Sequence, residues 1–326
     1  MTVPVLSVLR KTYPQLQLTL LSRPFFKPLF RDIPDLGFLE ADVYGKHRNT
    51  GLIKLAKEAR DLEIDAVADL HNVIRSKLIT GYLKIKGIRS AVIDKGRAEK
   101  KALTARDEHK KISPLKTTHS RYADVFEALG YPVDLENYSP PERRKLLPKL
   151  TALIGVEPKK IIGIAPFAAH PGKEYPLSRI KEVIARLDAG SKYRILLFGG
   201  GKKETALLKQ LARSFENVSS AAGEFSFEEE LILISNLDLM VSMDSGNGHL
   251  AANFGIPVLT LFGVTHPFAG FAPFRQKESQ QLIADRKQFP LIPTSVYGNR
   301  YPKGYEKAMD TIDPQDVVSK IESMLS

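Results

Sequence analysis

Strand-like and helix-like segments alternate along most of this chain. This alternation is typical of βαβ units, which build parallel sheets. Strand patterns occupy residues 16–22, 66–72, 90–94, 161–167, 193–200, 237–244 and 257–263. Helical patterns occupy residues 51–63, 75–85, 117–132, 177–189, 203–215, 226–236, 246–254 and 313–325. The sequence therefore predicts an α/β protein with doubly wound parallel sheets.

The pattern breaks once, over residues 133–160, which contain four prolines and read as a linker with a short helix. A chain of 326 residues is long enough for two domains that each bury a core. We expect an N-terminal domain over residues 1–145, a second domain over 146–310, and a C-terminal helix within 311–326. Asp313 and Pro314 are suited to the start of that helix.

Composition excludes several classes of protein. The chain has no Cys, which rules out disulfides, thiolate catalysis and thiolate metal sites. Its seven His residues form no pair at the spacing of metal ligands on a helix. No apolar stretch reaches the roughly 20 residues of a membrane span, and no signal peptide is visible. We expect a soluble, cytoplasmic protein without a metal site.

The net charge of +11 is concentrated in one segment. Between Lys84 and Arg121 the chain has twelve Lys or Arg and four Asp or Glu. One interpretation is a solvated helix face or loop. The other is a surface that binds phosphates, carboxylates or an anionic membrane.

The N-terminus departs from the pattern of a doubly wound domain, which opens with a buried strand. Residues 3–13 carry apolar side chains at helical spacing, so the chain begins within a helix. The first strand of such a sheet is usually central, and its absence would expose its neighbours. We therefore expect that Met1 is an internal Met of a longer protein.

Four loops of the second domain follow predicted strands, where α/β sheets bind ligands. The first carries His170 and Lys173, the second has backbone amides at Gly199, Gly200 and Gly201, and the fourth is "VTHP". At one edge of one sheet, these loops could collect amides, hydroxyls and a Lys around a pyrophosphate. Lys173 taken alone could equally be a solvated side chain.

The third loop, "DSGNGHLAA", combines a carboxylate with two glycines at the start of a helix. Gly246 and Gly248 allow close backbone approach, and the helix dipole favours a phosphate there. The simpler interpretation is that Asp244 or Ser245 only caps the helix. Asp244 would repel a phosphate unless it accepts hydrogen bonds from sugar hydroxyls. A carboxylate that binds hydroxyls, next to amides that bind phosphates, suits a nucleotide-sugar. His249, taken alone, is compatible with a structural role.

In the first domain, "DLHNVIRSKL" places His71 at a strand end and Arg75 in the next turn. His71 could be a buried, hydrogen-bonded residue, or it could bind an acceptor together with Arg75. No Ser-His-Asp order, metal constellation or phosphate loop of the Walker type can be assembled.

Several of these segments together resemble glycosyltransferase family 9, the ADP-heptose:lipopolysaccharide heptosyltransferases. "SMDSGNGHLAANFGIPVLTLFGVTHP" is similar to the family signature D-S/T-G-x-x-H-L-A-A-x-x-G-x-P, and "GIAPFAAHPGKEYPLSRI" to its G-x-x-P-x-A segment. "LFGGGKKE" resembles the glycine loop, and "DLHNVIRSKLI" the D-L-H/Q-x-x-x-R-S segment. The resemblance covers nearly the whole chain.

The resemblance implies a GT-B fold, with two Rossmann-like domains facing across a cleft and the last helix packing back on the first domain. It implies that Lys173 balances the diphosphate, that amides from Ser245 to Gly248 hold phosphate, and that Asp244 contacts sugar hydroxyls. Gly200 and His249 fall within the donor motifs. Glu204 would hold the ribose, and Thr265 would lie near the phosphates. His71 and Arg75 would belong to the acceptor side.

The family works by inversion without a metal or other cofactor, which implies a nucleotide-sugar donor and an anionic lipid-linked saccharide acceptor. The resemblance also implies peripheral contact with the inner membrane face and no nucleic-acid partner. The family's general base is an Asp in a loop that would precede Met1, so no catalytic residue is assigned. Two alternatives remain: a nucleotide-sugar binder that does not catalyse transfer, and a nicotinamide-dependent oxidoreductase.

Overall fold

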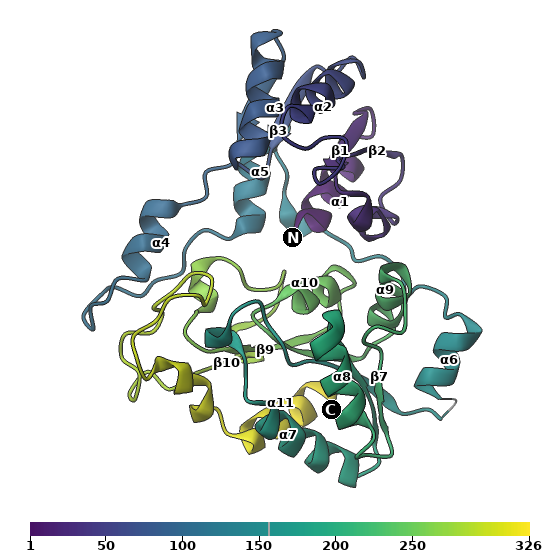
Figure 1. The fold of residues 1–326 in the computed structure, drawn as a ribbon, viewed down its shortest axis with the longest axis vertical. Helices are drawn as coiled ribbons and strands as arrows, with labels where there is room; N and C mark the ends of the chain where they lie inside the picture. Colours follow the sequence, from purple (N-terminus) through teal and green to yellow (C-terminus); the bar gives the residue numbers. More distant parts are fainter. Residues whose placement is uncertain (156) are drawn as a thin grey trace. The chain divides into compact units, whose positions relative to one another are not determined.

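A computed structural model describes residues 1–155 and 157–326. Val156, within the predicted linker, lies outside the described residues. The chain divides into two compact units (Figure 1). The first contains residues 1–96 and 116–139, and the second contains residues 97–115 and 140–326.

The first unit is built from short parallel strands and the helices that follow them. Its helices are α1 (Thr2–Thr12), η1 (Pro24–Phe30), α2 (Gly51–Arg60), α3 (Ile74–Ile85), α5 (Thr118–Ala128) and η2 (Leu135–Asn137). Its strands are β1 (Leu18–Ser22), β2 (Leu36–Glu40), β3 (Ala66–Asp69) and β4 (Arg89–Val92). The strands form two separate parallel pairs, β1 with β2 and β3 with β4. Every residue of β1 and β2 is at least partly exposed, so most of the core of this unit comes from its helices.

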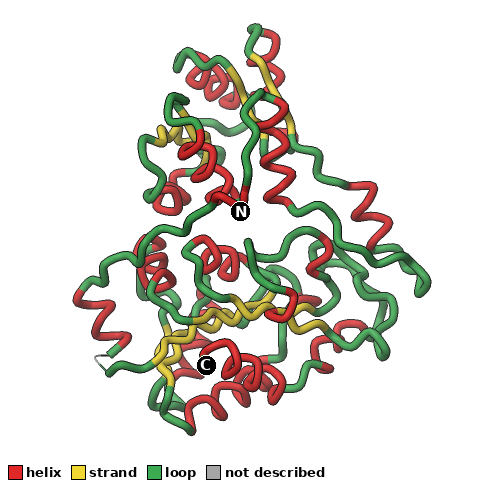
Figure 2. Tube along the Cα trace, turned by 180° about the vertical axis from the view of Figure 1, so that it is seen from behind, coloured by secondary structure: helices red, strands yellow, loops and turns green. Residues whose placement is uncertain are grey.

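The second unit is organised around one parallel sheet of six strands, which Figure 2 shows in yellow between layers of red helices. The strands are β5 (Lys160–Ala165), β6 (Tyr193–Leu197), β7 (Val218–Ser220), β8 (Leu239–Met243), β9 (Val258–Phe262) and β10 (Gln281–Ile283). Their order is β10-β9-β8-β5-β6-β7. The first strand is central and the chain winds outward from it in both directions, which is the doubly wound topology predicted from the sequence.

Helices cover both faces of this sheet. They are α6 (Pro148–Ile154), α7 (Leu177–Ala189), α8 (Gly201–Ala212), α9 (Phe227–Ser235), α10 (Gly246–Asn253) and α11 (Pro314–Leu325), with short turns η3 (Pro171–Lys173), η4 (Pro267–Ala269), η5 (Glu278–Gln280) and η6 (Tyr305–Thr311). Buried residues of α7, α8 and α11 pack with alternate residues of β5, β6, β8 and β9. Among residues 1–155 and 157–326, no helix has the length and hydrophobicity needed to span a bilayer.

The last helix, α11, begins at the predicted cap and packs within the second unit. Asp313 caps α11 through a hydrogen bond from the Gln315 amide, as the sequence predicts. Its apolar residues Val317, Val318 and Ile321 are buried in the core of the second unit. These residues of α11 therefore pack within the second unit, and the packing of this helix on the first domain stays a prediction.

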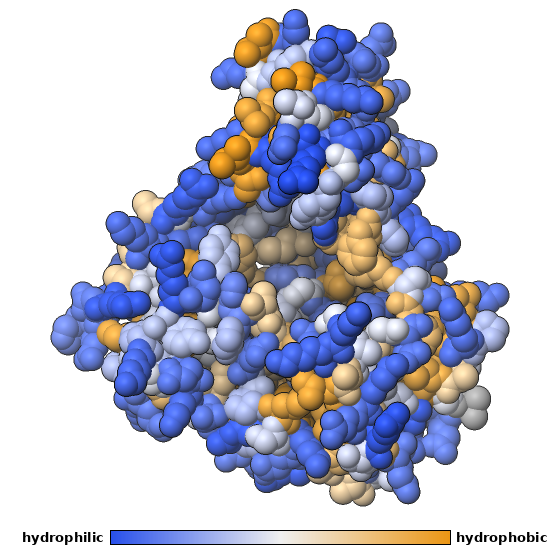
Figure 3. Space-filling view, in the orientation of Figure 1, coloured by the Kyte–Doolittle hydropathy of each residue, from blue (hydrophilic) through white to orange (hydrophobic). Residues whose placement is uncertain are grey.

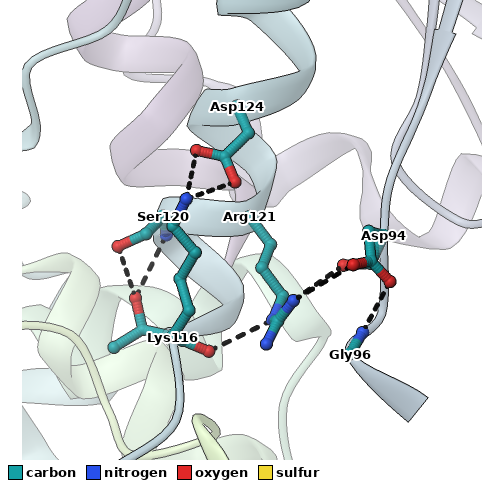
Figure 4. A network of polar contacts seen from close by, with 7 residues as sticks. Asp94, Gly96, Lys116, Ser120, Arg121 and Asp124 are labelled. Atoms are coloured by element: carbon teal, nitrogen blue, oxygen red, sulfur yellow. Dashed lines mark hydrogen bonds and ion pairs between the residues drawn. The ribbon is translucent and has the colours of Figure 1, made fainter. Parts of the chain in front are cut away.

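The segment 97–115, with helix α4 (Arg97–Leu103), leaves the first unit after Gly96 and re-enters it at Lys116. Arg121 of α5 holds both ends (Figure 4). Its guanidinium donates hydrogen bonds to the carbonyl oxygens of Asp94 (3.3 Å) and Lys116 (3.2 Å), and it pairs with the Asp94 carboxylate at 3.7 Å. Arg121 is only 4% exposed. Arg121 therefore connects the chain after β4, where the segment 97–115 begins, to α5, which follows the segment.

Several cations of the basic segment 84–121 are used inside the protein. Besides the buried Arg121, Lys100 is 7% exposed and lies 4.1 Å from the Phe271 ring centroid. Lys110 donates to the carbonyl oxygens of Leu291 (2.6 Å) and Pro293 (2.5 Å) in the second unit. Neither sequence interpretation is correct for these three residues, because their charges fasten the segment in place instead of facing solvent or a ligand.

Candidate functional site

The loops after β5 and β8 lie next to each other because these two strands are paired in the sheet. On one side of β5 lie β6 and β7, and on the other side lie β8, β9 and β10. Such a point, where the strand order reverses, is where open α/β sheets bind ligands beyond the carboxyl ends of their strands. Lys173 comes from the first loop, and Asp244 directly follows β8.

Lys173 and Asp244 form an ion pair across this point. The Lys173 Nζ lies 3.2 Å from the Asp244 Oδ2, and the side chains are 13% and 9% exposed. The interpretation of Lys173 as a solvated side chain is therefore wrong. Two charges withdrawn from water gain little net stability from each other. This arrangement is better suited to binding, since it offers a cation for an anionic group and a carboxylate for hydroxyls.

The backbone around Lys173 is packed so closely that its position is fixed. Gly298 has a φ of +79°, and a Cβ there would come within 2.7 Å of the Lys173 Cδ. A Cβ on Gly172 would lie 2.7 Å from the Gly298 carbonyl oxygen. Tyr175 is 2% exposed, and its hydroxyl donates to the Ile312 carbonyl oxygen at 2.8 Å. Burial raises the pKa of Tyr175 to about 12, which keeps this donor protonated.

Helix α10 points its N-terminus at the same edge of the sheet. Ser245 is its N-cap residue, yet no side chain caps the helix. The interpretation of Asp244 or Ser245 as a simple helix cap is therefore wrong. The Ser245 Oγ is buried without a hydrogen-bond partner in the described structure, and a Cβ on Gly246 would meet nothing within 4 Å. The first amides of α10 thus have open space beside them for an anion.

The other predicted residues near α10 have different environments. Gly248 is buried, and a Cβ there would lie 2.5 Å from the Ser242 Oγ, so it allows α10 to pack against β8. His249 is partly buried on α10. Thr265, in the loop after β9, is 1% exposed, and its Oγ1 has no hydrogen-bond partner in the described structure. A buried hydroxyl without a partner is costly in a protein alone, which favours a ligand partner.

The glycine loop after β6 is closed by its own helix. The Glu204 carboxylate, in the first turn of α8, accepts a hydrogen bond of 2.8 Å from the Gly200 amide. The amide that the sequence predicts for a phosphate therefore has a partner already. Glu204 remains a candidate for ribose hydroxyls, because a carboxylate accepts further hydrogen bonds with its free lone pairs.

In the first unit, His71 and Arg75 are both exposed. The interpretation of His71 as a buried residue is therefore wrong. The turn before it is shaped by Asp69, whose Oδ1 accepts hydrogen bonds from the amides of His71 (2.9 Å) and Asn72 (2.8 Å). His71 and Arg75 thus remain candidates for binding an acceptor.

Two residues that position the site were missed from the sequence. Gly298 lies about 125 residues after Lys173, and no local pattern links the two. Tyr175 sits within the predicted "KEYP" motif, but its bond to Ile312 depends on the packing of the chain end. For Gly298, the sequence signal is the turn-like "YGN" of residues 297–299, because Gly is favoured where φ is positive.

A doubly wound α/β unit with a six-stranded parallel sheet, and a second α/β unit of parallel strands, define the fold class. The chain is a glycosyltransferase of the GT-B fold. It belongs to glycosyltransferase family 9 (heptosyltransferase), whose model matches residues 52–290.

Solved structures and relatives in sequence agree with this membership. A family 9 glycosyltransferase from Veillonella parvula superposes with a TM-score of 0.74 at 19% identity, covering 99% of this chain and 92% of that one. An Escherichia coli heptosyltransferase with ADP gives a TM-score of 0.65 at 18% identity, with 99% and 95% covered. In sequence, lipopolysaccharide heptosyltransferase 3 of Escherichia coli is 25% identical, covering 100% of this chain and 94% of that protein. Lipooligosaccharide heptosyltransferase 2 of Haemophilus influenzae is 25% identical, with 98% and 93% covered.

Proposed function

We propose that this heptosyltransferase moves a heptose from ADP-heptose to an anionic, lipid-linked saccharide such as the inner core of lipopolysaccharide. The observation that carries the proposal is the buried pair of Lys173 and Asp244 at the switch point of the sheet. Relatives named as lipopolysaccharide and lipooligosaccharide heptosyltransferases support the acceptor class, and a solved relative that holds ADP supports the nucleotide. The reaction would take place at the cytoplasmic face of the inner membrane.

The donor would be held by opposite charges and by hydroxyls. Lys173 and the first amides of α10 face the diphosphate, and Thr265 adds a buried hydroxyl. Asp244 accepts hydrogen bonds from the sugar, whose hydroxyls are donors. When the diphosphate arrives, it competes with Asp244 for Lys173, so the carboxylate becomes available to the sugar at the same moment.

In the transfer step, an acceptor hydroxyl oxygen attacks the anomeric carbon from the side opposite the diphosphate. The bond between that carbon and the phosphate oxygen breaks, and ADP leaves with the bonding electrons. The hydroxyl proton passes to a base, and the configuration inverts. Lys173 and the α10 amides stabilise the charge that grows on the leaving diphosphate, an effect worth about 10²–10³ in rate for one well-placed donor. No metal or cofactor is part of this proposal.

The experiment is to mix the protein with ADP-heptose and a lipopolysaccharide precursor and to follow the acceptor by mass spectrometry. The proposal predicts an acceptor heavier by one heptose, equimolar ADP, and no change on adding a chelator. UDP-glucose and GDP-mannose serve as comparison donors, and they should give little product.

Three outcomes would contradict the proposal. Thermal stabilisation by ADP-heptose without product would identify a nucleotide-sugar binder, and faster transfer from a comparison donor would identify another sugar. Loss of activity with the chelator would show that a metal takes part. The oxidoreductase alternative has no support from the family.

A further inference from the structure

A large apolar groove lies between α2 and α3 of the first unit. It has a volume of about 1220 Å³. Its lining includes Tyr44, Ile53, Ile74, Leu78 and Ile85. Figure 3 shows hydrophobic surface gathered over α3, surrounded by hydrophilic surface.

Helix α3 is apolar on two sides. Ile79 and Leu83 are buried and pack in the core of the first unit. Ile74, Leu78 and Ile85 follow a second stripe at helical spacing, and they are 80%, 58% and 85% exposed. Gly81 lies on the same stripe, where a Cβ would meet nothing within 4 Å. Only the first stripe is buried in the core, so folding does not explain why the residues of the second stripe are apolar.

The exposed apolar side chains of this protein are concentrated in the groove. The five lining residues make up half of the ten large apolar side chains that are exposed among the described residues. Single exposed apolar residues are common, but a contiguous patch marks a site that meets a partner or a membrane. The groove is therefore a docking surface, and its charge indicates what docks there.

The two segments that line the groove are rich in cations, and Arg48, Arg75 and Lys77 belong to the lining itself. Residues 43–57 contain four Lys or Arg, residues 70–93 contain five, and neither stretch contains Asp or Glu. Within the described part of the chain, Arg48, Lys54, Lys77, Lys84 and Lys86 form no ion pair; Lys46 is paired weakly with Glu58 at 3.8 Å. Lys100 and Arg121 are buried and Lys110 is partly buried, whereas these five side chains are exposed.

We propose that the face formed by α2 and α3 docks on an anionic phospholipid membrane. Ile53, Ile74, Leu78 and Ile85 would enter the boundary between headgroups and acyl chains, with Tyr44 at headgroup level. The surrounding Lys and Arg side chains would bind lipid phosphates. An apolar stripe bordered by Lys and Arg is the pattern of helices that lie in a membrane interface. A protein that bound here instead would need acidic residues opposite the Lys and Arg side chains that border the apolar stripe.

This inference deepens the proposed function, because a lipid-linked acceptor is presented on such a membrane. The two can fail separately. Vesicle binding is measured without donor or acceptor, and transfer can be measured on an acceptor dispersed in detergent. If the unchanged protein transfers heptose but does not bind anionic vesicles, only the docking surface is contradicted. If it binds the vesicles but transfers no heptose, only the proposed function is contradicted.

The experiment is sedimentation of the full chain with vesicles of phosphatidylcholine alone or with phosphatidylglycerol added. We expect binding to the mixed vesicles only, weakening as salt is raised. Ile74→Glu with Leu78→Glu should lower the affinity at least tenfold, and Lys77→Glu with Lys84→Glu should lower it by about tenfold. Matched controls outside the groove are Leu62→Glu with Leu147→Glu, and Lys181→Glu with Lys192→Glu, which should bind as the unchanged protein does.

Circular dichroism and thermal unfolding verify that each variant is folded. Because all four substituted groove residues are exposed, folding should be retained. Equal binding to neutral vesicles, or equal losses in the control variants, would overturn the proposal. The proposal would also be overturned if the unchanged protein self-associates and Ile74→Glu with Leu78→Glu abolishes this, because the groove would then be filled by a second copy.

Discussion

Lys173 and Asp244 belong to separate loops, yet their charged atoms lie 3.2 Å apart at the point where the strand order of the sheet reverses. Lys173→Ala should weaken ADP binding by about 10- to 100-fold, because a charge-assisted contact to phosphate is lost in a partly buried place. Isothermal titration calorimetry measures this directly. Lys192→Ala removes an exposed Lys from the same unit and is the control. Equal affinities for the two variants would show that Lys173 does not contact the nucleotide.

Gly298 positions Lys173 by making room for its side chain. Gly298→Ala should destabilise the protein by about 1–2 kcal/mol, because an L-residue is strained at positive φ. It should also lower ADP affinity several-fold, because the new Cβ displaces Lys173. Gly304→Ala is a matched control, since Gly304 has a φ of +91° and open space around it. If both variants bind ADP alike, the contact with Lys173 has no role in binding.

Arg121 fastens the two ends of the segment 97–115. Arg121→Ala should lower the free energy of unfolding by about 2–4 kcal/mol, since it removes a buried guanidinium together with its hydrogen bonds to two backbone carbonyl groups and its ion pair. Hydrogen exchange should become faster in residues 97–115. Lys116→Ala breaks the exposed pair with Asp124 in the same network and should cost less than about 1 kcal/mol. Unchanged exchange in the Arg121 variant would mean that other contacts hold the segment.

His266 makes stability depend on pH. Burial first, and then the charges of Arg286 and Lys110, lower the pKa of His266 to about 4, and its Nδ1 accepts a hydrogen bond from the Phe268 amide. The unfolded chain takes up a proton near pH 6.5, while the folded protein resists it down to about pH 4. Stability should therefore be complete above pH 6.5 and fall by about 3 kcal/mol towards pH 4.

His266→Asn tests this dependence, because Asn also accepts the Phe268 amide but does not titrate. The difference in melting temperature between the two proteins should narrow as the pH falls from 6.5 to 4. Glu230, whose pKa burial raises to about 7, acts in the opposite direction in both proteins and cancels in the comparison. Parallel curves over this range would refute the assignment to His266.

The elements predicted from the sequence are those with strong local patterns. The helix expected over 177–189 is found at those residues, because its apolar positions repeat at helical spacing and Pro176 precedes it. The strands β8 and β9 were predicted because both faces are buried and their sequences are continuously apolar. The short edge strands β7 and β10 were not predicted, since three residues carry no periodicity.

The candidate site was predicted in its residues but not in its contacts. Asp244 and Lys173 were proposed from loop position and motif resemblance, whereas their ion pair depends on the adjacency of β5 and β8, which only the folded sheet provides. The same holds for Glu204, whose bond to Gly200 occupies an amide expected to bind phosphate. The internal use of Lys100, Lys110 and Arg121 could not be foreseen either, because a charge count does not indicate burial.

The most direct test of the donor site compares the affinities for ADP and ADP-heptose before and after Asp244→Asn. If Lys173 faces the diphosphate and Asp244 faces the sugar, the substitution should leave ADP bound as tightly or several-fold more tightly, because Lys173 loses its competing partner. It should weaken ADP-heptose relative to ADP by about tenfold or more, because sugar hydroxyls lose a charged acceptor. Equal changes for both ligands, or a loss confined to ADP, would contradict the assignment.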